Sequence, residues 1–430
     1  MRLTPAHLEA ATAALRAVLP LEYPADSILR RFFRENSELG VNDRAFIAEA
    51  VFGILRHRFF LEQAVGTATP RALLLGYLAK FQGMNLRELT PLVTEAEAKW
   101  IAQLKAIKPE SQKLAVQAEF PEWLVEKLQV FMDEPGILEL GRSMQEPAPL
   151  DLRVNTLKGA RDEAVALLPD LDVQPSRWAP NGFRLEQKAE AKNPAIHAEP
   201  AFIKGLIEIQ DEGSQLAALI AGATPGEEVV DLCAGAGGKT LALAAAMENK
   251  GQIFATDTDK RRLAPIHARI ERAGARNVQV RTPERSGNEL ADLKGTIDLV
   301  VIDAPCTGTG SWRRNPDAKW RLRPGALEIR SKEQVTVLER AVPLVKAGGR
   351  IAYITCSVLD EENGAQLRAF VKRHPDFSVE KPASLTAALG ERGMLLIGRV
   401  AVPFGKCQLA RKSGRRVKVN RHFELLTDIP

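Results

Sequence analysis

Two of the four cysteines in this chain follow segments that have the composition of buried β-strands. Cys306 comes shortly after the apolar run IDLVVID, and Cys356 lies near the end of GRIAYITCS. Ligands of open α/β sheets bind beyond the carboxyl ends of the strands, so thiols at these positions can take part in chemistry. A free cysteine is more often a small buried hydrophobe, but that role suits a mid-strand position better than a strand end. Both thiols are therefore candidate nucleophiles.

A glycine-rich turn follows the first strand of the same region, in the sequence DLCAGAGGKT over residues 231–240. The last three residues fit a phosphate-binding P-loop, but Cys233 stands where the first glycine of that motif belongs. The spacing of the glycines also differs from that of a dinucleotide fingerprint. The third interpretation is a turn that contacts the amino-acid part of S-adenosylmethionine.

The next predicted strand ends at Asp257, in the segment GQIFATD. A carboxylate at the end of the second strand is well placed to accept hydrogen bonds from both hydroxyls of a ribose. A P-loop ATPase has no need of an acid at this position. A purely structural alternative is that Asp257 caps the helix predicted for DKRRLAPIHARI. Binding of an adenosine-type cofactor explains the glycine-rich turn and the acid together, and we favour it.

A thiol next to such a cofactor suggests methyl transfer to a pyrimidine. Carbon 5 of cytosine is a poor nucleophile, but addition of a thiolate to carbon 6 moves electron density onto carbon 5, which can then accept a methyl group. The attacking group must be a thiolate, so a nearby cation such as Lys239 would help by lowering its pKa. Asp303 is a candidate to hydrogen-bond N3 and the exocyclic amine of the base. The residues alone leave Cys306 and Cys356 level as the nucleophile, with the other thiol serving proton transfer or elimination.

The elements that must position these groups follow from the patterns along the chain. From about residue 226, the strand candidates EVVDLC, GQIFATD, NVQVRT, IDLVVIDAP and GRIAYITCS alternate with helical stretches, which predicts a doubly wound α/β domain. Residues 146–205 contain many prolines between strand-like pieces such as LDLRVN and FIKGLIEIQ, which predicts a small α+β segment. Residues 1–130 have helical spacing, for example at Ala45, Phe46 and Val51, and predict an all-helical domain.

The composition, with 45% hydrophobic and 26% charged residues, is ordinary for a soluble globular protein. We find no apolar run long enough for a membrane span and no signal-peptide core, so we expect a cytoplasmic protein without a membrane partner. The cysteines are too few for a disulfide framework and lack the paired spacing of a zinc site, so we expect no metal. The net charge of +5 is a weak indication of a polyanionic partner.

Two basic runs bear on that partner. Residues 405–421 are rich in lysine and arginine and contain no acid, and the run from Trp312 to Arg323 places tryptophans among its basic residues. Such mixtures suit phosphate contacts combined with base stacking. A solvated charged face is the competing interpretation, and it has more weight for residues 405–421 than for the run that contains the tryptophans.

Several segments match a known family in the same order along the chain. They are Arg153–Lys158, Ile209–Gln215, Cys233–Thr240, Asp303–Gly310 followed by Arg313–Asp317 and Lys319–Arg321, and Thr355–Ser357 with Glu361–Asn363. On these segments the chain resembles the Fmu/Sun-type RNA cytosine-5 methyltransferases, in particular the bacterial small-subunit ribosomal RNA branch. A weaker match at Asn42–Arg44, Phe46 and Val51–Gly53 resembles the NusB-like N-terminal domain of that branch.

The resemblance implies that Cys356 is the nucleophile and that Cys306 acts in release of the methylated product. It implies S-adenosyl-L-methionine as cofactor. The residues implied in cofactor binding are Cys233, Ala234, Gly235, Ala236, Gly237, Gly238, Lys239, Asp257 and Asp303. The domains implied are a NusB-like RNA-binding domain over 1–130, a small α+β subdomain over 146–205, a Rossmann-like methyltransferase domain over 206–400 and an atypical basic tail over 401–430.

We therefore expect a monomeric enzyme that forms 5-methylcytosine in small-subunit ribosomal RNA. Transfer RNA is the alternative substrate. A non-catalytic RNA-binding or antitermination-type factor is the alternative outside the enzymes. The presence of both Cys306 and Cys356 argues against that factor, because a scaffold has no reason to keep two thiols at one sheet edge.

Overall fold

The computed structural model describes residues 3–66, 68–185, 194–284, 287, 289–380 and 407–411. The chain divides into two compact units, which we describe separately. One unit consists of Met1–Ala148 together with Ser311–Pro324, and the other consists of Pro149–Gly310 together with Gly325–Pro430. The sequence did not predict that Ser311–Pro324, which interrupts the second unit, would belong to the first.

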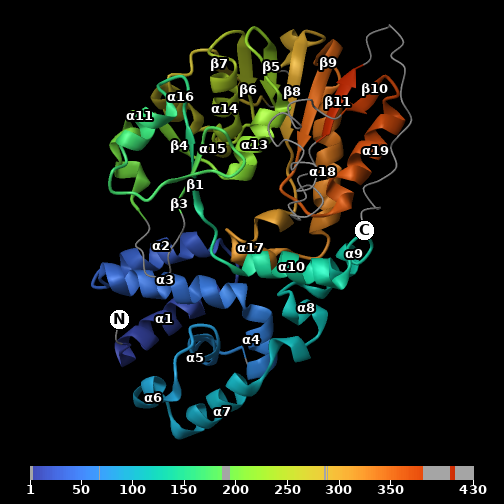
Figure 1. The fold of residues 1–430 in the computed structure, drawn as a ribbon. Helices are drawn as coiled ribbons and strands as arrows, with labels where there is room; N and C mark the ends of the chain where they lie inside the picture. Colours follow the sequence, from blue (N-terminus) through green and yellow to red (C-terminus); the bar gives the residue numbers. More distant parts are fainter. Residues whose placement is uncertain are drawn as a thin grey trace. The chain divides into compact units, whose positions relative to one another are not determined.

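The first unit is built from helices over its described residues (Figure 1), as the helical spacing of this region predicts. Its helices are α1 (Pro5–Val18), α2 (Ala25–Glu35), α3 (Val41–Arg56), α4 (Arg58–Val65), α5 (Pro70–Lys80), α6 (Leu86–Leu89), α7 (Glu95–Ala106), α8 (Leu114–Gln117), α9 (Glu122–Leu128), α10 (Glu134–Gln145) and α17 (Pro316–Arg321). The Thr4 side chain accepts a hydrogen bond from the backbone N–H of His7 and so caps α1. Apolar side chains spaced along α1, α3 and α5 form the core.

The segment Ser311–Pro324 is packed into this helical unit through its tryptophans. Trp312 is only 1% exposed and packs edge-on against Phe120, while the Trp320 Nε1–H donates to the Leu55 carbonyl over 2.7 Å. The interpretation of these tryptophans as a stacking surface for RNA bases is therefore wrong for Trp312, while Trp320 is half-buried against the core of the helical unit. Burying a large apolar ring stabilises the folded state more than leaving it exposed to water.

The second unit begins with a small antiparallel sheet of strand order β2-β3-β1-β4. Its elements are β1 (Leu150–Val154), α11 (Arg161–Ala166), β2 (Gln174–Pro175), β3 (Gly182–Leu185), α12 (Pro200–Ile203) and β4 (Ile207–Ile209). The piece FIKGLIEIQ, predicted as strand, begins as helix α12 and becomes a strand only at Ile207. Because β4 pairs with β1, the small sheet continues past the predicted boundary at residue 205.

The large sheet has the strand order β10-β11-β9-β8-β5-β6-β7. Its strands are β5 (Glu228–Asp231), β6 (Gln252–Ala255), β7 (Val278–Val280), β8 (Ile297–Asp303), β9 (Val345–Ile354), β10 (Phe377–Glu380) and β11 (Cys407–Arg411). The pairs β9–β8, β8–β5, β5–β6 and β6–β7 are parallel, which confirms the Rossmann-like part of the predicted fold.

The strand β11 lies in the segment that was predicted to be an atypical basic tail. It pairs antiparallel with both β9 and β10 and so completes the sheet, which makes the predicted domain boundary at residue 400 wrong. Strand pairing uses backbone groups, and the basic composition therefore did not reveal it. The rest of the predicted tail, 401–406 and 412–430, lies outside the described residues.

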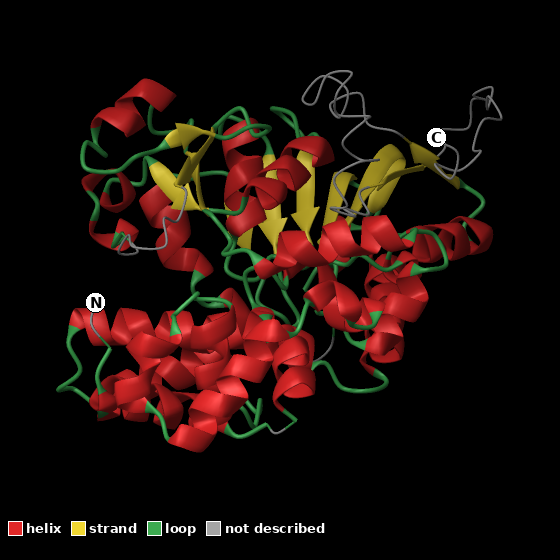
Figure 2. Cartoon of the chain, turned by 60° about the horizontal axis from the view of Figure 1, so that its bottom comes forward, coloured by secondary structure: helices red, strands yellow, loops and turns green. Residues whose placement is uncertain are grey.

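Helices cover both faces of the large sheet (Figure 2). They are α13 (Glu212–Ala221), α14 (Gly238–Ala246), α15 (Lys260–Leu263), α16 (Ile266–Ala273), α18 (Ala326–Ala341) and α19 (Gly364–Arg373). Successive residues of β8 alternate between two cores: Leu299 and Val301 pack with α13 and α14, whereas Val300 packs with α18 and α19. This doubly covered parallel sheet explains why its strands are apolar throughout.

No helix within the described residues has both the length and the apolar character needed to cross a membrane.

Candidate active site

The two thiols predicted to share one sheet edge lie next to each other. β8 and β9 are neighbouring parallel strands, paired through Asp303 and Ile354 at their carboxyl ends. The turns that follow them bring the Cys306 Sγ to 3.3 Å from the Cys356 Sγ. Cys356 is exposed and Cys306 is half-buried. A substrate can therefore reach Cys356 more readily.

The environment makes the two thiols unequal. The hydrogen bond from Cys306 lowers the pKa of the Cys356 thiol, and the Lys239 charge lowers it further, against the effects of burial and of Asp303 and Glu362. The same hydrogen bond and burial raise the pKa of Cys306. These directions correspond to a Cys306 S–H that donates to a Cys356 thiolate. The geometry thus distinguishes two residues that strand-end placement left level.

Lys239 and Asp303 form an ion pair beside the thiols. The Lys239 Nζ lies 2.6 Å from the Asp303 Oδ2, with 13% of the lysine side chain and 38% of the aspartate side chain exposed. Lys239 belongs to the first turn of α14, and Asp303 is the last residue of β8. The pair therefore links the glycine-rich turn to the strand that leads to Cys306, and the aspartate remains open to a ligand.

The predicted cofactor turn runs from the end of β5 to the start of α14. Within it, the backbone N–H of Ala234 donates to the Thr256 carbonyl, and the backbone N–H of Gly235 donates to the Asp257 Oδ2 over 2.9 Å. Asp257 is 3% exposed and follows β6. Two of the predicted cofactor positions, the glycine turn and the acid, thus meet directly.

Cys233 is part of this turn and differs from Cys306 and Cys356. Burial, followed by the charge of Asp231, raises the pKa of its thiol, so it stays protonated. The Asp231 carboxylate accepts hydrogen bonds from the Thr240 hydroxyl and the Cys233 backbone N–H. Burial raises the pKa of Asp231 to about 6. Cys233 therefore shapes the turn without acting as a nucleophile.

The residues of the turn fit S-adenosylmethionine. A Cβ placed on Gly235 would meet no atom closer than 3.7 Å, so the backbone there borders open space facing Asp257 and Arg262. The turn would hold the amino-acid part of the cofactor through backbone groups, and the Asp257 carboxylate would accept hydrogen bonds from ribose hydroxyls.

Sequence reasoning missed the polar residues behind these groups. Gln210 accepts a hydrogen bond from the Arg153 Nε over 2.6 Å and donates to the Gly238 carbonyl over 3.2 Å, so the small sheet supports the glycine turn. Glu362 contacts the turn that carries Cys306, and Asn363 contacts the turn that carries Cys356. These residues lie in the family-matching segments Ile209–Gln215 and Glu361–Asn363, which could have pointed to them. The spacing of residues in those segments does not show what each residue does.

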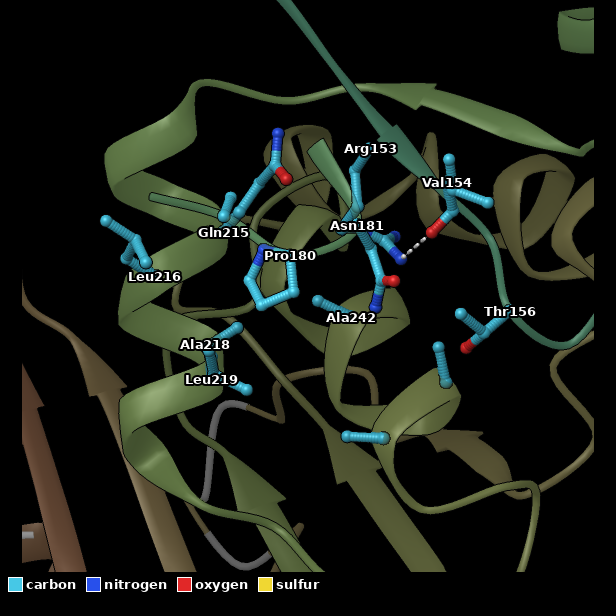
Figure 3. Close-up of a pocket in the computed structure, with 13 residues that line it drawn as sticks. Arg153, Val154, Thr156, Pro180, Asn181, Gln215, Leu216, Ala218, Leu219 and Ala242 are labelled. Carbon is cyan, nitrogen blue, oxygen red and sulfur yellow. Dashed lines mark hydrogen bonds between the residues drawn. The ribbon is translucent and has the colours of Figure 1, made fainter. Parts of the chain in front are cut away.

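A separate cavity of about 100 Å³ lies between the small sheet and helices α13 and α14 (Figure 3). Pro180, Leu216, Leu219 and several alanines form most of its wall. Gln215 lines the cavity, and its Oε1 has no hydrogen-bond partner among the residues that the structure describes. No predicted site residue contributes to this cavity, so it is distinct from the edge where the thiols meet.

Comparisons with known families and proteins agree with this geometry. The family model for the 16S rRNA methyltransferase RsmB/F matches residues 218–395, and the model for the RsmF/B-like ferredoxin-like domain matches residues 120–192. The first match contains the glycine turn and both thiols. The second overlaps the predicted α+β segment.

Similar proteins carry related names. The ribosomal RNA small subunit methyltransferase B of Citrobacter koseri is 31% identical over 366 residues, which cover 78% of this chain and 83% of that protein. A probable ribosomal RNA small subunit methyltransferase B of Synechocystis sp. is 31% identical over 295 residues, which cover 68% of this chain and 65% of that protein. The chain thus spans just under two thirds of the Synechocystis protein.

Solved structures show the same fold. A crystal structure of PH0851 has a TM-score of 0.68 and 26% identity, and the match covers 88% of this chain and 92% of that chain. A methyltransferase homologue from Pyrococcus horikoshii has a TM-score of 0.55 and 26% identity, with 71% of this chain and 100% of that chain covered. Since the identity to the Citrobacter protein extends over most of both chains, this chain belongs to the RsmB/F family of 16S rRNA methyltransferases.

Proposed function

We propose that this protein transfers a methyl group from S-adenosylmethionine to carbon 5 of a cytosine in small-subunit ribosomal RNA, with Cys356 as the nucleophile. The observation that carries the proposal is the contact of the two thiols, 3.3 Å apart, with the pKa of the exposed Cys356 lowered by its hydrogen bond from Cys306. A thiol whose pKa is lowered next to a cofactor turn suits addition to a pyrimidine, because the attacking group is the thiolate.

In the first step the Cys356 thiolate attacks carbon 6 of the cytosine and forms a carbon–sulfur bond. Negative charge then develops on the ring. Asp303 would hydrogen-bond the N3 side of the base, and Lys239, 2.6 Å from its carboxylate, would hold it in place. S-adenosylmethionine, when bound, supplies the methyl group that the electron-rich carbon 5 accepts.

Release of the product requires removal of the carbon 5 proton and cleavage of the carbon–sulfur bond. The largest cause that raises the pKa of Cys306 is its hydrogen bond to Cys356. Once the Cys356 sulfur is bonded to carbon 6, it is no longer an anion, so this cause disappears and Cys306 can release its proton to solvent. The Cys306 thiolate then takes the proton from carbon 5 as the Cys356 sulfur leaves as a thiolate.

The names of the relatives support ribosomal RNA as substrate, because the Citrobacter and Synechocystis proteins are both named as small-subunit methyltransferases. We assign RNA binding to the NusB-like helical region 1–130, positioning of the cofactor turn to the small α+β subdomain 146–205, and the chemistry to the methyltransferase domain that begins near residue 206. We propose that the protein acts as a monomer in the cytoplasm.

Single substitutions of the two thiols test this mechanism. With 16S rRNA and S-adenosylmethionine, Cys356→Ala is expected to abolish methyl transfer. Cys306→Ala is expected to accumulate a protein–RNA adduct that survives denaturing electrophoresis. An adduct that forms in Cys356→Ala and is absent from Cys306→Ala would reverse the roles.

The substrate is tested separately. Bisulfite sequencing of RNA treated with the wild-type protein should show a new 5-methylcytosine in 16S rRNA and none in transfer RNA from the same reaction. Modification of transfer RNA alone would contradict the substrate but not the chemistry. Failure to bind S-adenosylmethionine in calorimetry would contradict the enzymatic function itself.

A further inference from the structure

A buried carboxylate behind the thiols has no ion-pair partner among the described residues. Glu362 lies at the end of the 3-10 turn Asp360–Glu362 and is 0% exposed. Its carboxylate accepts hydrogen bonds from the backbone N–H of Thr307 over 2.8 Å, from the Thr307 hydroxyl, and from the Gln334 Nε2 over 3.0 Å. Burial of a carboxylate without a cation is costly unless hydrogen bonds such as these satisfy its oxygens.

The hydrogen bonds of the Glu362 carboxylate support the turn that carries Cys306. Thr307 is the next residue in the chain after Cys306, and both its backbone N–H and its hydroxyl donate to the Glu362 carboxylate. Gln334 on α18 also donates to the carbonyl of Pro305 over 2.9 Å. The residues on either side of Cys306 are therefore held through one carboxylate and one amide.

The adjacent residue, Asn363, holds the other turn. Its Nδ2 donates to the carbonyls of Ser357 and Leu359 over 3.0 and 2.8 Å, and its Oδ1 accepts from the Thr355 hydroxyl over 2.5 Å. Thr355 and Ser357 flank Cys356. Two consecutive residues thus anchor the two turns that carry the two thiols, one turn each.

Direct contacts join the two turns as well. The backbone N–H of Gly310 donates to the Cys356 carbonyl over 2.8 Å, and the Thr309 hydroxyl accepts from the Val358 backbone N–H over 2.9 Å. A Cβ on Gly310 would stand 2.8 Å from the Cys356 carbonyl oxygen, so only glycine allows this approach. The separation of the two sulfurs is therefore set by several contacts that depend on one another.

We infer that Glu362 and Asn363 are positioning residues that hold Cys306 within hydrogen-bond distance of Cys356 and thereby determine which thiol carries the negative charge. The inference deepens the proposed function and rests on it for the catalytic consequence. Neither residue touches the reacting atoms. They act through the turns on either side, so their loss should change the ionisation of Cys356 without removing a reacting group.

The experiment titrates the thiols without RNA or cofactor, so its outcome does not depend on the proposed function. The rate of alkylation of Cys356 by iodoacetamide is measured against pH, with the modified cysteine identified by peptide mass spectrometry. The wild type should show a midpoint below pH 9, because the pKa of Cys356 is lowered. Thr307→Val and Asn363→Ala should each move the midpoint up by about one unit, which slows alkylation at pH 7 about tenfold. Glu362→Gln should move it up by less, because the Glu362 charge itself raises the pKa of Cys356 and the substitution removes that charge.

A double substitution separates positioning from general loosening of the structure. If Glu362 positions Cys306, then Glu362→Gln should not raise the midpoint further in the Cys306→Ala background, where only the loss of the Glu362 charge remains and lowers the pKa of Cys356. Asp360→Asn is the matched control, because Asp360 lies in the same turn but is exposed and paired with Arg368. It should leave the midpoint of Cys356 unchanged.

Thr307→Val preserves the shape of the side chain and removes only its hydroxyl. It therefore tests the inference even if Glu362→Gln does not fold. The inference is overturned if the folded variants alkylate Cys356 with the wild-type pH profile. It is equally overturned if Glu362→Gln raises the midpoint as much in the Cys306→Ala background as in the wild type.

Discussion

Two lysines of this protein each lie beside an acidic residue, one at the partly exposed sheet edge and one buried in the helical unit. Lys239 meets Asp303 at the sheet edge, where 38% of the aspartate side chain is exposed. Lys319 lies within the helical unit at 5% exposure, donates to the backbone carbonyl of Glu119 over 2.6 Å, and is close to a carboxylate that is 2% exposed. Burial lowers the pKa of Lys319 to about 8 and raises that of Glu119 to about 7.

The contrast shows that burial, and not residue type, decides what such a pair does. The Glu119 carboxylate accepts the backbone N–H groups of Phe59 and Phe60 at the start of α4, over 2.9 and 3.1 Å. Because Lys319 donates to the Glu119 backbone carbonyl, Glu119 connects the segment Ser311–Pro324 to the start of α4 within the helical unit. The open pair, Lys239–Asp303, keeps a carboxylate available for a substrate. Substitutions in the two pairs should therefore affect different properties.

The largest effect is expected for stability at the closed pair. Lys319→Met should lower the free energy of unfolding by about 3–5 kcal/mol, because it leaves the buried Glu119 charge without its cation. Urea unfolding followed by tryptophan fluorescence measures this. The double variant Lys319→Met/Glu119→Gln should recover part of the loss. If Lys319→Met lowers the free energy of unfolding by less than about 1 kcal/mol, the buried pair is no more important for stability than the exposed pair.

The open pair should affect activity instead. Lys239→Met should lower kcat/KM for methyl transfer by about 10²–10³-fold, because Asp303 loses the group that holds it and Cys356 loses a nearby positive charge. The free energy of unfolding should change by no more than about 1 kcal/mol for this partly exposed pair. Activity within about threefold of the wild type would contradict the role assigned to Lys239.

The closed pair should also respond to pH. Because the pKa of Glu119 is raised from 4.5 to about 7 in the folded protein, the folded state binds a proton between these values that the unfolded state does not bind. The stabilising contribution of Glu119 is therefore present below pH 4.5 and lost as pH rises to about 7. Relative to Glu119→Gln, the wild type should gain at most about 3 kcal/mol on going from pH 7 to pH 4.5. A flat difference would contradict burial of this carboxylate.

The smallest effect concerns the tryptophan next to Lys319. Trp320→Phe keeps the aromatic ring but removes the hydrogen bond from Nε1 to the Leu55 carbonyl. The expected loss is about 1 kcal/mol of unfolding free energy, with unchanged binding of 16S rRNA in a filter assay. A large loss of RNA affinity with unchanged stability would restore the stacking interpretation of this residue.

The sequence by itself determined the features that depend on local pattern. Alternation of apolar strands and helices predicted the doubly covered sheet, and the strand ends placed Cys306, Cys356 and Asp257 at one edge. The glycine turn before Lys239 indicated the cofactor. These inferences succeed because strand period and the ends of parallel strands follow from residues close together in the chain.

Only the tertiary structure decided the features that depend on burial and on contacts between distant segments. Trp312 and Trp320 look like a binding surface in the sequence, but Trp312 is buried inside the helical unit and Trp320 is half-buried against its core. The basic segment at the end of the chain contributes the strand β11 through its backbone. The difference between Cys306 and Cys356 arises from a sulfur–sulfur contact that Glu362 and Asn363 hold from behind. A pKa depends on the dielectric and the charges within a few ångströms, and packing alone brings these groups together.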